Sequence, residues 1–267
     1  EEILLIHARK KPLAEEVTLK VVAERTPGFS GADLYSLMNE AAILAAREDR
    51  TKLSQYDLIR SIEKVMLGPE RKSHLLSMKE KEITAYHEAG HALVSSVLEY
   101  ADPVHKISII SRGRAAGYTL NLPLEDRKLQ SRREFLADIA MSLGGFVAEK
   151  MVFGDTTTGP SNDLQVSTAL ARDMVTKYGM SEKIGALALE SQSGGAIFGK
   201  SLQDKDYSEK VSADIDAEVS KLMKQGLTTA EEILTKYRGV LDAIAKRLVE
   251  VETLERDAFE QMLVAHG

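Results

Sequence analysis

Cysteine is absent from this chain of 267 residues. Without thiols the protein has neither a disulfide framework nor a thiolate metal site, so any metal must be bound by histidine, aspartate or glutamate. Aromatic residues are also scarce, at 5% of the chain, and no apolar run reaches the roughly eighteen residues that a membrane-spanning helix needs. The contents of hydrophobic residues, 43%, and of charged residues, 28%, are instead typical of a folded globular protein. We therefore expect a packed, mainly helical structure.

The chain also has no excess of basic over acidic residues. Lysine and arginine number 35, against 41 aspartate and glutamate residues, which gives a formal net charge of -6. No basic cluster is long enough to bind a phosphate backbone, so we do not expect nucleic acid as a partner. The N-terminus has neither an initiator methionine nor a signal-peptide pattern. We expect the chain to be part of a longer protein, in which targeting or membrane segments could lie upstream.

The first part of the chain has three stretches with hydrophobic residues at helical spacing. They cover residues 14–24, 31–48 and about 54–65. Capping boxes, in which a serine is followed three residues later by an acidic residue, mark three helix starts in the chain: Ser30 with Asp33, Ser54 with Asp57, and Ser77 with Glu80. The spacing and the first two caps predict a small helical unit.

A polar, turn-rich stretch that includes Gly68 and Pro69 follows these helices and predicts a domain boundary. We assign residues 1–67 to the helical unit, residues 68–75 to a linker and residues 76–267 to a second, larger domain.

The second domain is predicted to be mostly helical around one small sheet. Its first helix runs from residue 77 to about residue 99, and the β-prone runs 104–110 and 117–122 predict two short strands. Further helices are predicted at residues 131–152, 162–178, 208–236, 238–250 and 255–265. We expect Gly144-Gly145 to interrupt the first of these.

The run His87-Glu88-Ala89-Gly90-His91 lies in the middle of the first helix of the second domain. Residues four apart on a helix lie one turn apart on the same face, so His87 and His91 can offer two imidazole nitrogens to one metal ion. Glu88 is one step along from the first histidine and is placed to act as a general base on the attacking water. This pattern predicts a zinc peptidase centre.

A catalytic zinc site has three protein ligands and one open position, so a third ligand must come from elsewhere. A histidine further along the same helix is excluded, because Val94 and Val97 stand at the positions that would extend the motif. A carboxylate is then expected, and the sequence offers Glu149 and Asp163. The spacing does not choose between them, since Glu149 could be a solvated helix residue and Asp163 a first-turn acid that interacts with the helix dipole.

Several further runs match one known family. They are Thr26 to Leu34, Asn39 to Ala42, Tyr86 to Ala92, Arg112-Gly113, Gly144-Gly145 with Ala148-Glu149, and Ser161 to Asp163. Together they resemble the membrane-anchored AAA+ zinc proteases of the FtsH type, which include the mitochondrial AAA proteases. The resemblance covers nearly the whole chain, although Ser111 stands where the family usually has proline and residues 191–206 match poorly.

The resemblance implies roles that the spacing leaves open. Asp163 would be the third zinc ligand, and Glu149 a neighbouring carboxylate that orients a ligand histidine. Residues 1–67 would be the lid of an AAA+ ATPase module, with Gly31 and Ala32 on the nucleotide side. The ATPase core, which would bind ATP and Mg²⁺, lies outside this chain.

The resemblance also implies how the protein acts on its substrates. Strand 104–110 would lie near the edge where an extended peptide adds to the sheet. Such proteins form homo-hexameric rings that thread unfolded or membrane proteins into a proteolytic chamber. The full-length protein would be anchored in a membrane through segments outside this chain, with the present part in the bacterial cytoplasm or in an organelle compartment.

Two other interpretations compete with the zinc endopeptidase. Residues 194–201, Gly-Gly-Ala-Ile-Phe-Gly-Lys-Ser, fit the phosphate-binding pattern of a P-loop NTPase. Polar residues flank this run where a buried strand and a helix would be needed, so we interpret 191–206 as a loop. The chain could also be a helical scaffold without catalysis, but a structural zinc site is usually closed by four ligands and needs no adjacent base such as Glu88.

Overall fold

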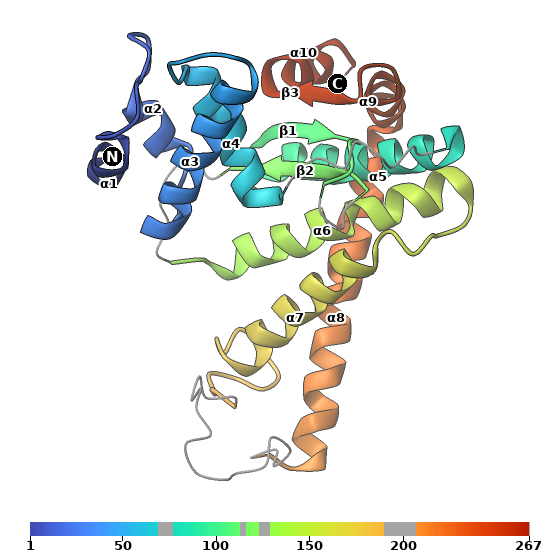
Figure 1. Ribbon diagram of the computed structural model, residues 1–267. Coiled ribbons are helices and arrows are strands. Elements are labelled where there is room, and N and C mark those ends of the chain that lie inside the picture. Colours follow the sequence, from blue (N-terminus) through green and yellow to red (C-terminus); the bar gives the residue numbers. More distant parts are fainter. Residues whose placement is uncertain (69–76, 113–115, 123–128, 190–206, 267) are drawn as a thin grey trace. The chain divides into compact units, whose positions relative to one another are not determined.

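The computed structural model describes residues 1–68, 77–112, 116–122, 129–189 and 207–266 (Figure 1). They form two compact units, which we describe separately. The first unit consists of Glu1–Leu76, Ile110–Tyr118 and Leu122–Lys128, and the second of Ser77–Ile109, Thr119–Asn121 and Leu129–Gly267.

In its described residues, the first unit has four helices, which are α1 (Glu2–Ala8), α2 (Leu19–Glu24), α3 (Gly31–Arg47) and α4 (Gln55–Leu67). Both predicted capping boxes of this unit are confirmed at the starts of α3 and α4. Each serine hydroxyl accepts a hydrogen bond from a backbone N–H that the helix leaves unpaired, and the acidic side chain accepts one from the backbone N–H of the serine. The hydrophobic faces meet in a core that includes Leu4, Val22, Leu37, Met38 and Leu58.

Helix α2 is shorter than the predicted helix at residues 14–24, because it begins at Leu19. The residues before it are held in another conformation by Leu53. The N–H of Ala14 donates to the Leu53 carbonyl, and the N–H of Leu53 donates to the Pro12 carbonyl. These contacts with a distant part of the chain replace the first helical turn, and hydrophobic spacing alone cannot reveal them.

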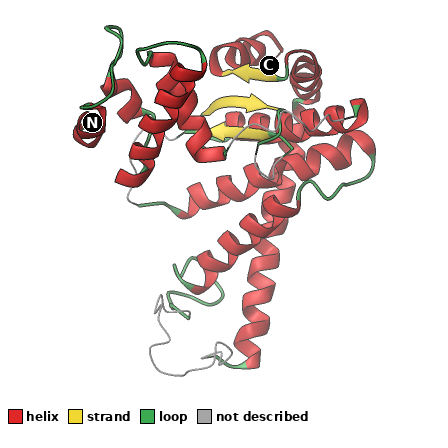
Figure 2. Ribbon diagram, viewed as in Figure 1, coloured by secondary structure: helices red, strands yellow, loops and turns green. Residues whose placement is uncertain are grey.

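From residue 77 on, the elements are α5 (Met78–Val97), β1 (Val104–Ser108), β2 (Tyr118–Asn121), α6 (Arg132–Phe153), α7 (Ser161–Thr176), α8 (Glu209–Lys236), α9 (Arg238–Val251), β3 (Thr253–Glu255) and α10 (Arg256–His266). Helices dominate beside one small sheet, which confirms the predicted fold class (Figure 2). None of the helices in the described ranges is long and apolar enough to cross a membrane.

The sheet has the strand order β2-β1-β3, so β1 lies in the middle. Strands β1 and β3 are antiparallel, with Ile107 opposite Leu254. The short strand β3 was not predicted, because its three residues lie between two helical patterns and carry no alternation of their own.

Helix α5 is the central helix of the second unit, and its residues from Thr84 to Ser95 are almost all buried. It packs against α6, α8, α9 and β1. Helix α6 also contributes to a second core, in which Ile139 and Leu143 meet hydrophobic residues of α7 and α8. The helices α7 and α8 lie side by side there (Figure 1). The site residues of α5 are therefore held between well-packed helices.

Helices α5 and α6 approach each other most closely at two glycines. A Cβ atom on Gly144 would lie 2.7 Å from the carbonyl oxygen of Gly90, and a Cβ on Gly90 would lie 2.5 Å from the carbonyl oxygen of Gly144. The predicted interruption at Gly144-Gly145 is wrong, since α6 runs unbroken from Arg132 to Phe153. The backbone penalty of glycine in a helix is offset here by close packing that a larger residue would prevent.

We predict that Gly144→Ala lowers the free energy of unfolding by about 1–3 kcal/mol, because the added methyl group meets backbone rather than a movable side chain. The matched control is Gly239→Ala in α9, where a Cβ would have no neighbour within 4 Å. Higher helix propensity should leave that variant equal to or up to about 1 kcal/mol more stable than the parent. Urea denaturation of both variants tests this, and equal stability of Gly144→Ala and the parent would contradict it.

Candidate metal centre

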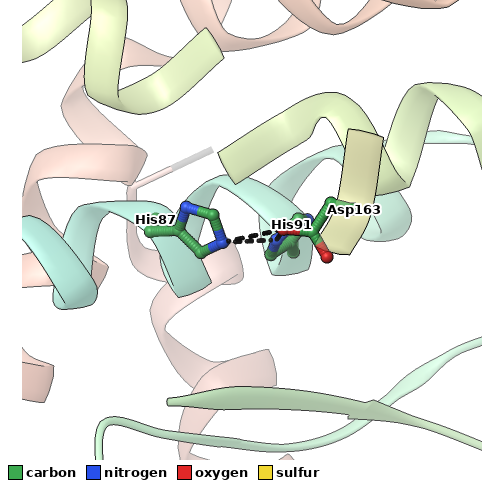
Figure 3. Close-up of side chains that lie close together, drawn as sticks. All are labelled: His87, His91 and Asp163. Carbon is green, nitrogen blue, oxygen red and sulfur yellow. Dashed lines mark hydrogen bonds and ion pairs between the residues drawn. The ribbon is translucent and has the colours of Figure 1, made fainter. Parts of the chain in front are cut away.

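His87 and His91 lie one turn apart on α5, and Asp163 reaches them from the first turn of α7 (Figure 3). The Nε2 atoms of the two histidines are 3.0 Å apart, and Asp163 Oδ2 lies 3.3 Å from Nε2 of His87 and 3.7 Å from Nε2 of His91. Ligands of a tetrahedral zinc ion, bonded at about 2.0–2.1 Å, stand about 3.3 Å apart. The three atoms are thus spaced as one ion requires.

The outer ring nitrogens of both histidines have hydrogen-bond acceptors. Nδ1 of His91 lies 2.8 Å from the carbonyl oxygen of Met141, and Nδ1 of His87 lies 2.9 Å from Oε1 of Glu149. Because a carbonyl oxygen only accepts, Nδ1 of His91 must carry the proton, and the neutral ring then presents a lone pair at Nε2. With the same assignment for a neutral His87, both Nε2 lone pairs face one point, which a shared proton or a metal ion can occupy.

Glu149 is almost fully buried, at 2% exposure, and connects His87 to the loop that precedes α7. One carboxylate oxygen contacts His87, and the other accepts a hydrogen bond of 2.9 Å from the backbone N–H of Thr157. The side chain therefore fixes the orientation of one histidine and, at the same time, the approach of the segment that carries Asp163. Glu149 contacts His87 from the side opposite to the Nε2 cluster, as a carboxylate that orients a ligand does.

The charges around the cluster favour a positive ion. Burial lowers the pKa of His87, but its hydrogen bonds to Asp163 and Glu149 and the charge of Glu88 raise it to about 10. Burial tends to raise the pKa of Asp163, yet its hydrogen bonds from His87 and His91 hold it well below its usual range. Burial tends to raise the pKa of Glu149 too, but the hydrogen bonds from His87 and Thr157, together with the charge of His87, lower it. A group of carboxylates that stays ionised around two imidazoles is suited to a divalent cation.

Glu88 lies beside the cluster without joining it. The side chain is buried, and its Oε2 accepts a hydrogen bond of 2.8 Å from the Thr119 hydroxyl on β2. Burial raises the pKa of Glu88, against the opposing charges of His87 and His91. A carboxylate with a raised pKa next to a possible metal position has the properties of a proton acceptor.

Gly145 allows the imidazole of His87 to lie close against α6. A Cβ on this residue would lie 2.5 Å from Cε1 of His87 and 2.6 Å from its Nδ1. Because the ring is also held by Glu149, it cannot turn away without losing that hydrogen bond. Gly145 therefore provides the space that sets the ring position.

The other predicted site residues lie elsewhere. Gly31 and Ala32 are exposed in the first turn of α3 in the first unit. The P-loop-like run 194–201 lies outside the described residues. The strand predicted near the peptide-binding edge, 104–110, contains β1, which is the middle strand and lies beside the edge strand β2. It is β2 that contacts Glu88, through Thr119.

Sequence reasoning missed several groups that hold the site. The contacts of His91 with the Met141 carbonyl and of Glu149 with the Thr157 N–H involve the backbone, which every residue has, so no residue type indicates them. Thr119 stands in an ordinary β-prone run. In the sequence, Gly145 suggests a helix breaker and gives no sign of its contact with His87.

A helix with the pattern His-Glu-x-x-His, joined by a carboxylate from a second helix, is the arrangement of a metallopeptidase. Comparison with protein families places the chain in one such class. The model of peptidase family M41 matches residues 74–262, and the model of the AAA+ lid domain matches residues 16–59. The chain belongs to peptidase family M41, and the resemblance seen in its motifs is confirmed.

Curated relatives agree with this assignment. The chain is 51% identical to the ATP-dependent zinc metalloprotease FtsH of Thermotoga maritima, over 98% of this chain and 43% of the relative. Proteins of the same name from Rubrobacter xylanophilus and Bacillus subtilis are 46% and 45% identical, over 98% and 100% of this chain and 40% and 42% of their own lengths. The chain thus spans about two fifths of these relatives.

We predict that Gly145→Ala weakens metal binding by about 10-fold to 100-fold, the range typical when the support of a ligand histidine is lost. The new methyl group would collide with the His87 ring while the ligand residues stay unchanged. Competition for zinc with a chromophoric chelator measures the affinity, and Gly239→Ala serves as the control with parental affinity. Unchanged affinity in Gly145→Ala would show that the ring position is not set by this glycine.

Proposed function

We propose that His87, His91 and Asp163 bind one zinc ion and that this chain is the peptidase part of an ATP-dependent zinc endopeptidase. The observation that carries the proposal is the convergence of three ligand atoms from α5 and α7, all within 4.8 Å of one another, beside the buried Glu88. Three ligands leave one position of a tetrahedral ion open, as catalysis requires. The curated relatives are zinc metalloproteases by name, which supports a zinc ion and protease activity here.

The proposed reaction is hydrolysis of a peptide bond. A bound zinc ion would lower the pKa of water to about 7 and polarise the peptide carbonyl. Glu88 takes the proton of the attacking water and later delivers it to the leaving amine. Its raised pKa suits both steps, because the group must bind the proton and also release it. Asp163 stays ionised as a ligand, and Glu149 holds the Nδ1 proton of His87 so that Nε2 faces the ion.

The position of the substrate follows from the sheet. Strand β2 is an edge strand, and its Thr119 contacts Glu88 directly. An extended peptide that added beside β2 would gain main-chain hydrogen bonds that do not depend on its side chains. We propose this edge, in place of the middle strand β1, as the peptide-binding edge. Unfolded protein segments would then be the substrates, selected by conformation more than by sequence.

The rest of the proposal concerns the longer protein. Residues 1–67 would be the AAA+ lid, 68–75 a linker and 76–267 the zinc peptidase domain, and the match to the AAA+ lid domain supports the first range. Gly31 and Ala32 would face a nucleotide, with ATP and Mg²⁺ bound by an ATPase core outside this chain. We further propose a homo-hexamer, anchored in a membrane through other segments, that acts on unfolded or membrane proteins. The present part would face the bacterial cytoplasm or an organelle compartment.

The two rival functions are less well supported. The run 194–201 falls inside the stretch that the peptidase family model matches, which does not favour a P-loop NTPase. A scaffold without catalysis would not need a buried carboxylate hydrogen-bonded beside a cluster of three possible metal ligands.

We predict that Glu88→Gln retains zinc but hydrolyses peptides at least about 100-fold more slowly, because the amide has a similar shape and cannot accept the proton. Turnover of an unstructured, internally quenched fluorescent peptide, together with the zinc content of the purified protein, measures both properties. Parental turnover in Glu88→Gln would refute the assignment of the general base.

A direct ligand and an orienting carboxylate should respond differently when their charge is removed. Asp163→Asn should lose zinc outright, because two histidines alone form a weak site and an amide is a poor substitute. Glu149→Gln should bind zinc about 10-fold to 100-fold more weakly and still load when zinc is in excess. Zinc titration against a competing chelator compares them. The reverse order of affinities would overturn the proposed ligand set.

A further inference from the structure

The Glu88 carboxylate is held by a residue that the sequence does not mark as functional. The Thr119 hydroxyl lies 2.8 Å from Oε2 of Glu88 and 3.1 Å from the backbone carbonyl oxygen of the same residue. The carboxylate oxygen and the carbonyl oxygen both accept, so the Thr119 hydroxyl is the donor in either contact. The shorter of the two hydrogen bonds goes to the carboxylate, which can carry charge. In the described part of the chain, this hydroxyl is the one hydrogen-bond donor that contacts the Glu88 carboxylate.

Strand β2, which carries Thr119, is itself held in place. Side chains alternate along β2, so Thr119 and Asn121 share a face opposite to that of Tyr118 and Leu120. The Asn121 amide donates a hydrogen bond of 2.6 Å to the Ser95 hydroxyl, near the end of α5, and one of 2.9 Å to the Asp102 carbonyl. Strand β2 is thus attached to α5 at two points, of which one is Glu88. A donor on an anchored strand can hold a carboxylate in one orientation.

Such an orientation matters for a general base. A glutamate side chain has three rotatable bonds, and proton transfer requires its oxygen within hydrogen-bond reach of the proton. The bond from Thr119 uses one acceptor position of Oε2 and leaves the other acceptor positions of the carboxylate for the reaction. Thr119 is not one of the residues that form the cluster of possible metal ligands. The contact of Thr119 with Glu88 therefore offers a route to the reaction that does not pass through a possible metal ligand.

We propose that Thr119 is a positioning residue for peptide hydrolysis, whose hydroxyl orients the Glu88 carboxylate toward the attacking water. This role rests on the proposed function of Glu88. Strand β2 would then have two roles. It would align the peptide, and it would carry the hydroxyl that orients the general base.

The test compares three variants of this chain. Thr119→Val keeps the shape and the β-propensity and removes the hydroxyl, so the kcat for a quenched unstructured peptide should fall about 10-fold to 100-fold. The KM and the zinc affinity should stay within about threefold of the parent. Thr119→Ser should recover most of the lost kcat, because it restores the donor. A matched control is Thr253→Val on β3. It also removes a strand hydroxyl with a 2.8 Å contact, to the hydroxyl of Ser108, and it should leave kcat unchanged.

The contact can also be tested without activity. In urea denaturation, Thr119→Val should shift the unfolding midpoint more in the parent than in a Glu88→Ala background, because the hydrogen bond is already lost there. Parental kcat in Thr119→Val, equal losses in Thr119→Val and Thr119→Ser, or additive midpoint shifts would each overturn the proposal. A parent chain that loads zinc and fails to cleave any peptide would count against the proposed function, while the Thr119 contact would still be decided by the midpoint shifts.

Discussion

The close contact of α5 with α6 is the constraint on which the site depends. Gly90 and Gly144 lie at this contact, where a Cβ on either residue would collide with the backbone of the other helix. Only at this distance can Gly145 lie against the His87 ring, and only then do Glu149 and the Met141 carbonyl reach the outer nitrogens of the two histidines. The packing of two backbones thus sets the geometry of a polar centre.

Placing this centre on a buried helix has an electrostatic consequence. His87, Glu88 and His91 lie among the hydrophobic residues of α5, where an unpaired polar group is costly. Each of them has a partner from another element, from α6 for both histidines and from β2 for the glutamate. The side of the two rings that faces Asp163 is the place where a cation would complete the pairing. The same contacts that satisfy buried groups therefore prepare the site for its proposed chemistry.

Local sequence signals predicted the helices correctly where contacts with residues remote in the sequence did not override them. The capping boxes at Ser30, Ser54 and Ser77 begin helices as expected, because caps act within one turn. The start of α2 and the continuity of α6 through Gly144 were predicted wrongly, since Leu53 and Gly90, remote in the sequence, decide them. The linker at residues 68–75 stays a prediction, although one family model ends before it, at residue 59, and the other begins within it, at residue 74.

The sequence by itself determined which candidate reactive groups lie together, because the spacing of His87, Glu88 and His91 needs only a helix to place them on adjoining faces. The tertiary structure alone decided which carboxylate faces the Nε2 atoms and which contacts Nδ1. Asp163 and Glu149 were equal candidates by spacing, and they take different places because α7 and α6 approach α5 from different directions. The contact of Thr119 with Glu88 and the edge position of β2 were also decided by the tertiary structure, since both depend on strand order and on residues 31 apart in the chain.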